Sequence, residues 1–257
     1  MTKLLGKRAL VTAGAQGIGL AISRQLLAAG CEVAVHYRTS AGAAEALARE
    51  ASTLGRRGVA LTGDLTRTEA CEALVAGAVQ ALGGLDILIN NAGSLIARRA
   101  FAEADDEFWA QTIMLNVGSL RKVTRAALPH LAAAAKSRGG ASIVNLASLA
   151  GRKGGHAGSL AYSTAKGAVL TFTRALAAEV GPQGIRVNAL APGLILGTSF
   201  HDTHTTKQSA DATVATIPLG RAGNADDVAR AAVFLAGEFD GFITGATLDI
   251  NGGVYCA

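Results

Sequence analysis

Short apolar runs alternate with longer helical patterns along nearly the whole chain, and this alternation limits the possible folds more than any other feature. The apolar runs are continuous, which is typical of strands buried on both faces of a sheet. We expect strands at 8–13, 32–37, 58–63, 85–90, 142–148, 185–190 and 246–250, and helices near 17–29, 41–54, 66–82, 105–135, 160–181 and 225–237. Because strand–helix–strand crossovers join parallel strands, the pattern predicts a doubly wound α/β fold, with a seven-stranded parallel sheet and helices on both faces.

The chain is predicted to form one domain over residues 1–257. Its length allows one large core, and the sequence contains no linker, internal repeat or low-complexity tract. The main change in composition is at 194–218, which is polar and rich in Thr and His and follows a strand. Since open α/β sheets bind ligands at the carboxyl ends of their strands, we interpret 194–218 as a substrate-binding lid.

Charge, hydropathy and cysteine content argue against several classes of protein. The 24 basic residues against 19 acidic ones are scattered, so we expect no nucleic-acid binding. No apolar run is long enough for a membrane span or a signal sequence. Cys31, Cys71 and Cys256 are widely spaced, and His201 and His204 have no third ligand beside them, so we expect neither disulfides nor a metal. A cytoplasmic protein is predicted.

The segment TAGAQGIG, residues 12–19, joins the first expected strand to a helix. Gly14, Gly17 and Gly19 let the backbone turn tightly and approach a diphosphate, with Gln16 and Ile18 between them. The N-terminus of the following helix offers free N–H groups to an anion. A tight structural turn is the alternative interpretation, but the position between strand and helix favours a dinucleotide.

The residues after the second expected strand bear on the choice of dinucleotide. A carboxylate there would bind the ribose diol of NAD and repel a 2′-phosphate. This chain has Tyr37 at that point, followed by Arg38, Thr39 and Ser40. A guanidinium can bind a phosphate through two hydrogen bonds, and the hydroxyls add donors. We therefore predict NADP(H) in preference to NAD(H), with an exposed loop arginine as the alternative.

Tyr162 and Lys166 lie four residues apart in a helical pattern, which places them on one face. A free tyrosine has a pKa of about 10 and is a poor acid–base group near neutrality. A nearby ammonium, together with the positive nicotinamide of an oxidised cofactor, would favour the phenolate. Taken alone, the pair is more often a core tyrosine beside a surface lysine, because this spacing occurs by chance in many helices.

Three motifs together resemble the short-chain dehydrogenase/reductase family: TxGxxGxG at 12–19, NNAG at 90–93 and YxxxK at 162–166. The resemblance extends from residue 8 to residue 253. The family's first glycine, directly after the threonine, is Ala13 in this chain. The resemblance implies a single Rossmann-type domain and an oxidoreductase that transfers a hydride between a nicotinamide cofactor and a carbonyl or secondary alcohol.

The resemblance also implies a set of catalytic residues. Tyr162 would be the general acid in reduction and the base in oxidation, and Lys166 would also bind the nicotinamide ribose. Ser148 would donate a hydrogen bond to the substrate carbonyl. Asn116 would hold a water that links the lysine to solvent.

Further cofactor contacts are expected at successive strand ends. By resemblance, Asp64 and Leu65 lie near the adenine, residues 91–93 near its ribose, and residues 192–195 near the nicotinamide. Relatives carry a threonine at the position of Gly197, and this chain has Thr198 one residue later. The expected cofactor-binding set is Gly14, Gln16, Gly17, Ile18, Gly19, Tyr37, Arg38, Thr39, Ser40, Asp64, Leu65, Asn91, Ala92, Gly93, Tyr162, Lys166, Pro192, Gly193 and Ile195.

The substrate is less constrained than the reaction. The chain most resembles bacterial 3-oxoacyl-acyl-carrier-protein reductases, which suggests a 3-oxoacyl thioester carried on acyl carrier protein. Gln183 stands where those reductases tend to have a basic docking residue, whereas Lys136 and Arg138 keep another contact available. A sugar, polyol or other alcohol dehydrogenase is an alternative, and a non-catalytic NADP(H)-sensing protein is another from a different class. A homotetramer is expected by resemblance only.

Several other residues are expected near the substrate. Leu95, Ile96 and His156 fall on loops that line the cleft in relatives. Arg98 is one of a basic pair that could meet an anionic substrate, and a solvated pair is the simpler interpretation. Ser159 is interpreted as a residue at the start of a helix rather than as part of the chemistry.

Overall fold

A computed structural model describes residues 4–198, 203–237 and 241–256. Its centre is a sheet of seven parallel strands in the order β3-β2-β1-β4-β5-β6-β7, which confirms the predicted sheet. The strands are β1 (Arg8–Val11), β2 (Glu32–Tyr37), β3 (Gly58–Thr62), β4 (Ile87–Asn90), β5 (Ala141–Leu146), β6 (Ile185–Pro192) and β7 (Thr247–Ile250).

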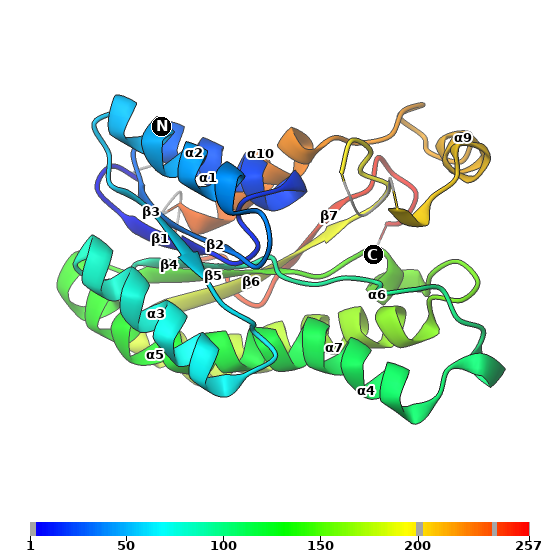
Figure 1. Ribbon diagram of the computed structural model, residues 1–257, viewed down its shortest axis with the longest axis horizontal. Helices are drawn as coiled ribbons and strands as arrows, with labels where there is room; N and C mark the ends of the chain where they lie inside the picture. Colours follow the sequence, from blue (N-terminus) through cyan, green and yellow to red (C-terminus); the bar gives the residue numbers. More distant parts are fainter. Residues whose placement is uncertain (1–3, 199–202, 238–240, 257) are drawn as a thin grey trace.

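Helices cover both faces of the sheet (Figure 1). One layer is formed by α1 (Gly17–Ala28), α2 (Ala41–Thr53) and α10 (Ala225–Ala236), and the other mainly by α3 (Thr68–Leu82), α5 (Ser119–Arg138) and α7 (Leu160–Val180). Each layer has its own apolar cluster against the sheet. Every residue of β5 is buried, and its two polar side chains, Ser142 and Asn145, are hydrogen-bonded to the helices packed on the sheet. No described helix is long and apolar enough to cross a membrane.

The order of the strands positions a ligand site. Chain order reverses where β1 lies beside β4, so the loops after these two strands leave in opposite directions. Open α/β sheets bind ligands at such a point, at the carboxyl ends of the strands. The loop after β1 is the glycine segment, and the loop after β4 begins with Asn91.

The helix expected at 105–135 is interrupted, and in this detail the prediction of one regular helix is wrong. It consists of α4 (Asp106–Ile113), a π-helical turn η2 (Met114–Gly118) and α5. Such a turn inserts an extra residue into the i→i−4 pattern and changes the direction of the side chains within it. Asn116 lies in this turn and is fully buried. The short elements η1 (Phe101–Glu103), α6 (Ala150–Lys153), η3 (Gly181–Gln183) and α9 (Lys207–Val214) were not predicted either.

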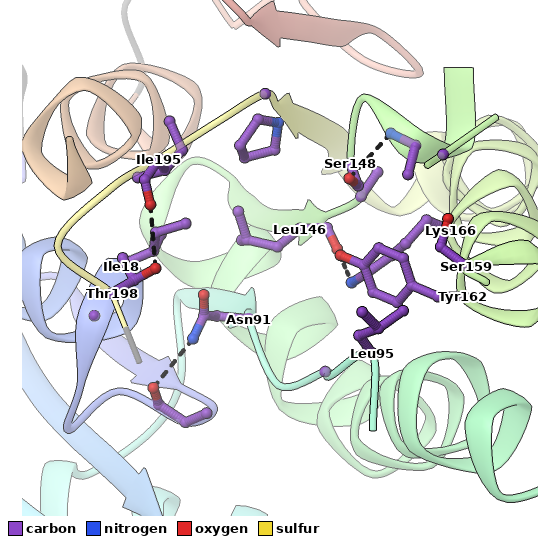
Figure 2. A pocket seen from close by; sticks show the side chains of 18 of the residues that line it. Ile18, Asn91, Leu95, Leu146, Ser148, Ser159, Tyr162, Lys166, Ile195 and Thr198 are labelled. Atoms are coloured by element: carbon purple, nitrogen blue, oxygen red, sulfur yellow. Dashed lines mark hydrogen bonds between the residues drawn. The ribbon is translucent and has the colours of Figure 1, made fainter. Parts of the chain in front are cut away.

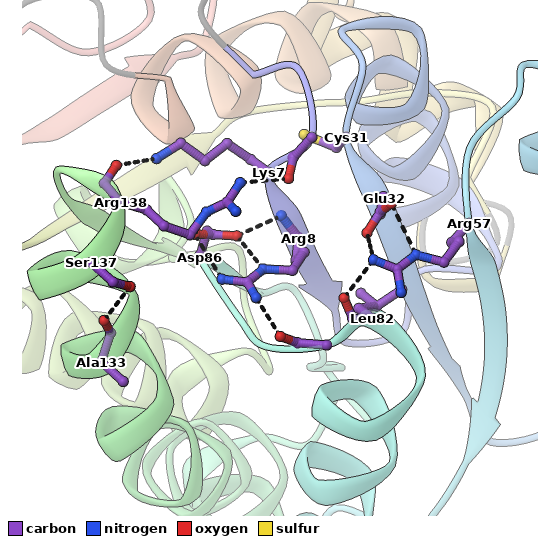
Figure 3. A network of polar contacts seen from close by, with 12 residues as sticks. Lys7, Arg8, Cys31, Glu32, Arg57, Leu82, Asp86, Ala133, Ser137 and Arg138 are labelled. Carbon is purple, nitrogen blue, oxygen red and sulfur yellow. Dashed lines mark hydrogen bonds and ion pairs between the residues drawn. The ribbon is translucent and has the colours of Figure 1, made fainter.

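An ionic network around the buried Asp86 lies at the amino ends of the strands (Figure 3). The Asp86 side chain, 1% exposed, accepts hydrogen bonds from the backbone and guanidinium of Arg8 and pairs with Arg138 at 3.0 Å. Lys7 donates to the carbonyl of Arg138. Arg138, one of the possible docking residues, is thus part of a network that joins β1, the segment before β4 and the end of α5.

Candidate active site

A cleft with a cavity volume of about 220 Å³ opens at the carboxyl ends of the strands (Figure 2). It is bounded by the glycine loop, the loops after β4, β5 and β6, and the first turns of α7. Twelve of the predicted site residues line it: Gln16, Gly17, Ile18, Gly19, Asn91, Gly93, Ser148, Tyr162, Lys166, Pro192, Gly193 and Ile195.

The glycine loop fits a diphosphate. Within the described part of the chain, no side chain caps the first turn of α1, so its N–H groups are available to an anion in the cleft. Gly17 has a φ of +49°, in the left-handed region that favours glycine. A Cβ on Gly19 would lie 2.1 Å from the carbonyl oxygen of Ala13, so this position has no room for a side chain.

Gly14 has a different role from the other two glycines. It does not line the cleft, and a Cβ there would lie 2.9 Å from Oγ of Ser23 on α1. The Ser23 hydroxyl in turn donates to the carbonyl of Gly14 at 3.1 Å. The structure therefore places Gly14 under the loop, where it lets the helix pack closely.

Thr198 reaches the glycine loop although it follows the usual threonine position by one residue. It is 6% exposed, and a Cβ on Gly17 would lie 3.5 Å from its side chain. Its hydroxyl donates to the carbonyl of Ile195 at 3.1 Å (Figure 2). Thr198 thus lines the part of the cleft that would hold the diphosphate.

Ser148, Tyr162 and Lys166 converge on the cleft wall opposite the glycine loop (Figure 2). Ser148 follows β5, and α7 carries the other two one turn apart, as predicted. The Ser148 hydroxyl accepts the N–H of Ala150 at 3.1 Å and is also hydrogen-bonded to Tyr162. Lys166 Nζ donates to the carbonyl of Leu146 at 2.6 Å and lies 5.8 Å from the centre of the Tyr162 ring.

Burial has the largest effect on the pKa values of Tyr162 and Lys166. It raises the pKa of Tyr162 to about 12, and the hydrogen bond from Ser148 opposes that rise. Burial also lowers the pKa of Lys166 to about 8. The effect of the Lys166 ammonium and an oxidised nicotinamide on the phenolate stays a prediction. At pH 7 Tyr162 is therefore neutral, which is the form that can donate a proton.

Asn116 lies behind the cleft wall rather than on it. Its Nδ2 donates to the carbonyls of Ser94 at 2.8 Å and Thr112 at 2.9 Å, and its Oδ1 accepts the N–H of Ser94 at 3.1 Å. A Cβ on Gly93 would lie 2.6 Å from Asn116 Oδ1 and 3.1 Å from Lys166 Nζ. The π-turn therefore brings Asn116 close to the lysine, with only Gly93 between them.

The segment after β2 joins the glycine loop through Ser40. Its hydroxyl donates to Oε1 of Gln16 at 3.2 Å, whereas Arg38 and Thr39 are exposed and Tyr37 is half-buried against the core. The positive charge of Arg38 contributes to the lowered pKa of Asp64, after the larger effect of hydrogen bonds from Thr66. The ends of β2 and β3 thus form one polar corner beside the loop.

Three predicted cofactor residues have structural contacts instead of cleft-lining positions. Asp64 accepts from the backbone and hydroxyl of Thr66, which closes the turn before α3. The Leu65 side chain is 5% exposed and packs in the core beneath α3. The N–H of Ala92 donates to Thr12 Oγ1 at 3.0 Å.

Some cleft residues were missed or given another role. Ala13, Leu146, Ala147, Ala150 and Gly155 line the cleft, but small and apolar residues give no chemical signal in the sequence. Ser159 is the N-cap residue of α7, as expected at a helix start, and also lines the cleft. Leu95 and His156 lie on the cleft wall, as expected from the resemblance.

The described part of the predicted lid contacts the loop after β4. Arg98 lines the cleft, and its guanidinium donates to the carbonyls of His204 at 3.2 Å and Ala157 at 3.3 Å. His201 lies outside the described residues. No group of three potential metal ligands occurs among the residues that the structure describes.

Known proteins with similar sequences cover almost the whole chain. A family model described as enoyl-(acyl carrier protein) reductase matches residues 12–255. Nodulation protein G of Azospirillum brasilense is 39% identical over 248 residues, which are 96% of this chain and 98% of that protein. The 3-oxoacyl-[acyl-carrier-protein] reductase FabG of Pseudomonas aeruginosa is 38% identical over 256 residues, covering 98% of each.

Solved structures share the fold at similar identity. An NADH-dependent reductase, A1-R′, responsible for alginate metabolism, superposes with a TM-score of 0.91 at 32% identity and covers 100% of both chains. A short-chain dehydrogenase from Burkholderia cenocepacia in complex with NADP gives a TM-score of 0.89 at 35% identity, with 98% of this chain and 99% of that chain covered.

Proposed function

The chain belongs to the short-chain dehydrogenase/reductase family of oxidoreductases, and on this premise we propose that it reduces a carbonyl substrate with NADPH and uses Tyr162 as the general acid. The observation that carries the proposal is the convergence of Ser148, Tyr162 and Lys166 on one wall of a cleft whose other wall is the glycine loop. This arrangement brings a proton donor and a dinucleotide-binding loop to the same space.

The protein's own groups supply binding, polarisation and the proton. Bound NADPH would supply the hydride. Ser148 donates a hydrogen bond to the substrate carbonyl, which polarises the carbon–oxygen bond. Tyr162, neutral at pH 7 because its pKa is about 12, gives its proton to the alkoxide oxygen as charge develops. The Lys166 ammonium stabilises the phenolate that remains, and it is near enough to the cleft to bind ribose hydroxyls.

Tyr162→Phe tests the proposed acid. We expect carbonyl-dependent NADPH oxidation to fall by about a thousandfold, while the NADPH dissociation constant measured by fluorescence changes less than about twofold. Tyr255→Phe is the matched control, because Tyr255 is a partly buried tyrosine near the chain end and outside the cleft. Substantial reductase activity in a folded Tyr162→Phe protein would refute the mechanism.

The preference for NADPH rests on Arg38. Its guanidinium is exposed beside the glycine loop and can bind a 2′-phosphate. The similar structures include an NADP complex and an NADH-dependent enzyme, so they support a nicotinamide cofactor of either kind. We expect Arg38→Asp to weaken NADPH binding about a hundredfold and NADH binding little. Arg49→Asp on α2 makes the same charge change and should spare both; equal losses in Arg38→Asp would overturn the preference.

For the substrate, we propose a 3-oxoacyl thioester, in line with the similarity to FabG, and carried on acyl carrier protein. A sugar-derived carbonyl is the second candidate, supported by the likeness to a reductase of alginate metabolism. A screen of NADPH oxidation over 3-oxoacyl thioesters, ketoses, quinones and simple ketones separates the two. The absence of turnover with every carbonyl, together with tight NADPH binding, would instead support an NADP(H)-sensing protein.

The lid, the assembly and the location belong to the same proposal. We propose that 194–218 covers bound substrate, which the Arg98 hydrogen bond to His204 supports. We also propose a cytoplasmic homotetramer. Light scattering after gel filtration should give about four times the chain mass of 25.9 kDa, and a monomer mass would contradict this assembly.

A further inference from the structure

Ala13 has a backbone conformation that alanine rarely adopts. Its φ is +48°, in the left-handed region that glycine occupies without a steric penalty. This is the position where the TGxxxGxG loops of similar proteins have their first glycine. Ala13 lines the cleft, and its carbonyl oxygen is so close to Gly19 that a Cβ on Gly19 would lie 2.1 Å from it. The loop can keep this shape only if its surroundings hold the alanine in place.

The side chain of His36 holds the amide of Ala13. His36 is 3% exposed, and its Nδ1 accepts the Ala13 N–H at 2.9 Å. Its Nε2 lies 2.9 Å from the carbonyl oxygen of Gly63. Because an amide N–H can only donate and a carbonyl can only accept, the ring is the neutral tautomer with its proton on Nε2. Burial also lowers the pKa of His36, in agreement with a neutral ring.

The backbone of the loop is fixed on both sides of Ala13. The main-chain carbonyl of His36 accepts the N–H of Gly14 at 2.8 Å, so one residue of β2 binds two successive amides of the loop. From the other side, Asn91 Nδ2 donates to the carbonyls of Thr12 and Ala13, at 3.1 Å each. Both polar groups of the Ala13 main chain are therefore bound by side chains from neighbouring strand ends.

We infer that His36 is a positioning residue for the cofactor site, which holds Ala13 in the left-handed conformation and so keeps the glycine loop in the shape that receives a dinucleotide. His36 is not among the residues that line the cleft, so it acts through Ala13 rather than on the cofactor. Alanine at 13 and histidine at 36 form a compensating pair, in which the imidazole offsets the strain of the extra methyl group. The inference rests on the proposed function only in assuming that this loop binds NADPH.

A double-mutant cycle tests the pair. The NADPH dissociation constant is measured by fluorescence for the native protein, His36→Leu, Ala13→Gly and the double variant, and thermal unfolding verifies that each is folded. We expect His36→Leu to weaken NADPH binding about tenfold in the native background, because Ala13 loses its acceptor and relaxes to a negative φ. In the Ala13→Gly background the same substitution should weaken NADPH binding only about twofold, since glycine adopts a positive φ without a steric penalty.

His36→Asn is the matched rescue variant. Its Oδ1 takes the place of Nδ1 and can accept the Ala13 N–H, while the bond to Gly63 is lost. We expect its NADPH affinity to stay within about threefold of the native value. If His36→Leu does not fold, this variant and its Ala13→Gly partner still test the inference, because a tenfold loss in both backgrounds would contradict it.

The outcomes separate this inference from the proposed function. If the native protein binds neither NADPH nor NADH, the proposed function fails. If it binds NADPH and His36→Leu weakens binding equally in both backgrounds, or in neither, the proposed function stands and the role of His36 is wrong. A loss that is large with alanine and small with glycine at position 13 supports it.

Discussion

Gly93→Ala is a sharp test of the site, because one methyl group would enter the space between two functional residues. The added Cβ would lie 2.6 Å from Asn116 Oδ1 and 3.1 Å from Lys166 Nζ, whereas ordinary contacts begin near 3.4 Å. Gly93 has no positive φ in the structure, so its backbone tolerates alanine. The perturbation is therefore steric and acts directly on the two side chains.

The size of the effect follows from the contacts that must give way. Asn116 would have to move by about 1 Å, which breaks or stretches its two hydrogen bonds with Ser94. At about 1 kcal/mol for each bond, the free energy of unfolding should fall by about 2 kcal/mol. Lys166 would have to give way by only a few tenths of an ångström. Since an error of about 1 Å in a catalytic site costs about a hundredfold in rate, the shift of Asn116 should lower kcat for carbonyl reduction by about that factor.

Steady-state NADPH oxidation and urea unfolding measure the two effects on the same protein. Gly167→Ala is the matched control: it adds the same methyl group one residue after Lys166, where its Cβ would meet only the carbonyl of Gly151 at 3.6 Å. As a glycine replaced within a helix, it should raise the free energy of unfolding by up to about 1 kcal/mol and leave kcat within about twofold. A folded Gly93→Ala protein with kcat within about threefold of native would refute the steric argument.

Two further predictions concern charge. The pKa of Lys166, lowered to about 8, means that its ammonium is present below pH 8 and is lost above it. With Tyr162 neutral throughout that range, kcat for reduction should be constant from about pH 6 to 7.5 and decline above pH 8; a rise between pH 8 and 10 would contradict this role of the lysine. Asp86→Asn should lower the free energy of unfolding by about 3 kcal/mol in urea titrations, because Arg8 and Arg138 lose their buried partner, and should leave the KM for NADPH unchanged. Native stability in that variant would show that the network contributes little.

The sequence was enough to predict the sheet and the main cluster of the site. Mainly apolar runs such as the one at β5 indicate strands buried on both faces, and their alternation with helices leaves few topologies. Once Tyr162 and Lys166 are placed on a helix and Ser148 at a strand end, the parallel sheet brings them to the same edge. For these three residues, the strand or helix that carries each one is therefore enough to predict that it lies in the cleft.

Other features depend on contacts between distant segments, which local patterns do not record. The π-turn at Asn116 was not predicted from the helical periodicity of 105–135, because that pattern alone does not show where a helix takes in one extra residue. The contact of Thr198 with Gly17 depends on the path of a loop. The support of Ala13 by His36 joins positions 23 residues apart, and in the sequence His36 is one polar residue within an apolar strand.

The opposite pKa shifts in the site bear on the direction of the reaction. Burial penalises charge on both side chains, so it stabilises the neutral phenol of Tyr162 and reduces the excess of ammonium over amine at Lys166. In the proposed reduction, Tyr162 starts as the neutral phenol, which is its form at pH 7. It becomes charged only when it gives its proton to the substrate. Oxidation must first remove that proton, from a group whose pKa lies well above neutral pH. In the proposed mechanism we therefore expect reduction to proceed near neutral pH and the rate of oxidation to increase as the pH rises.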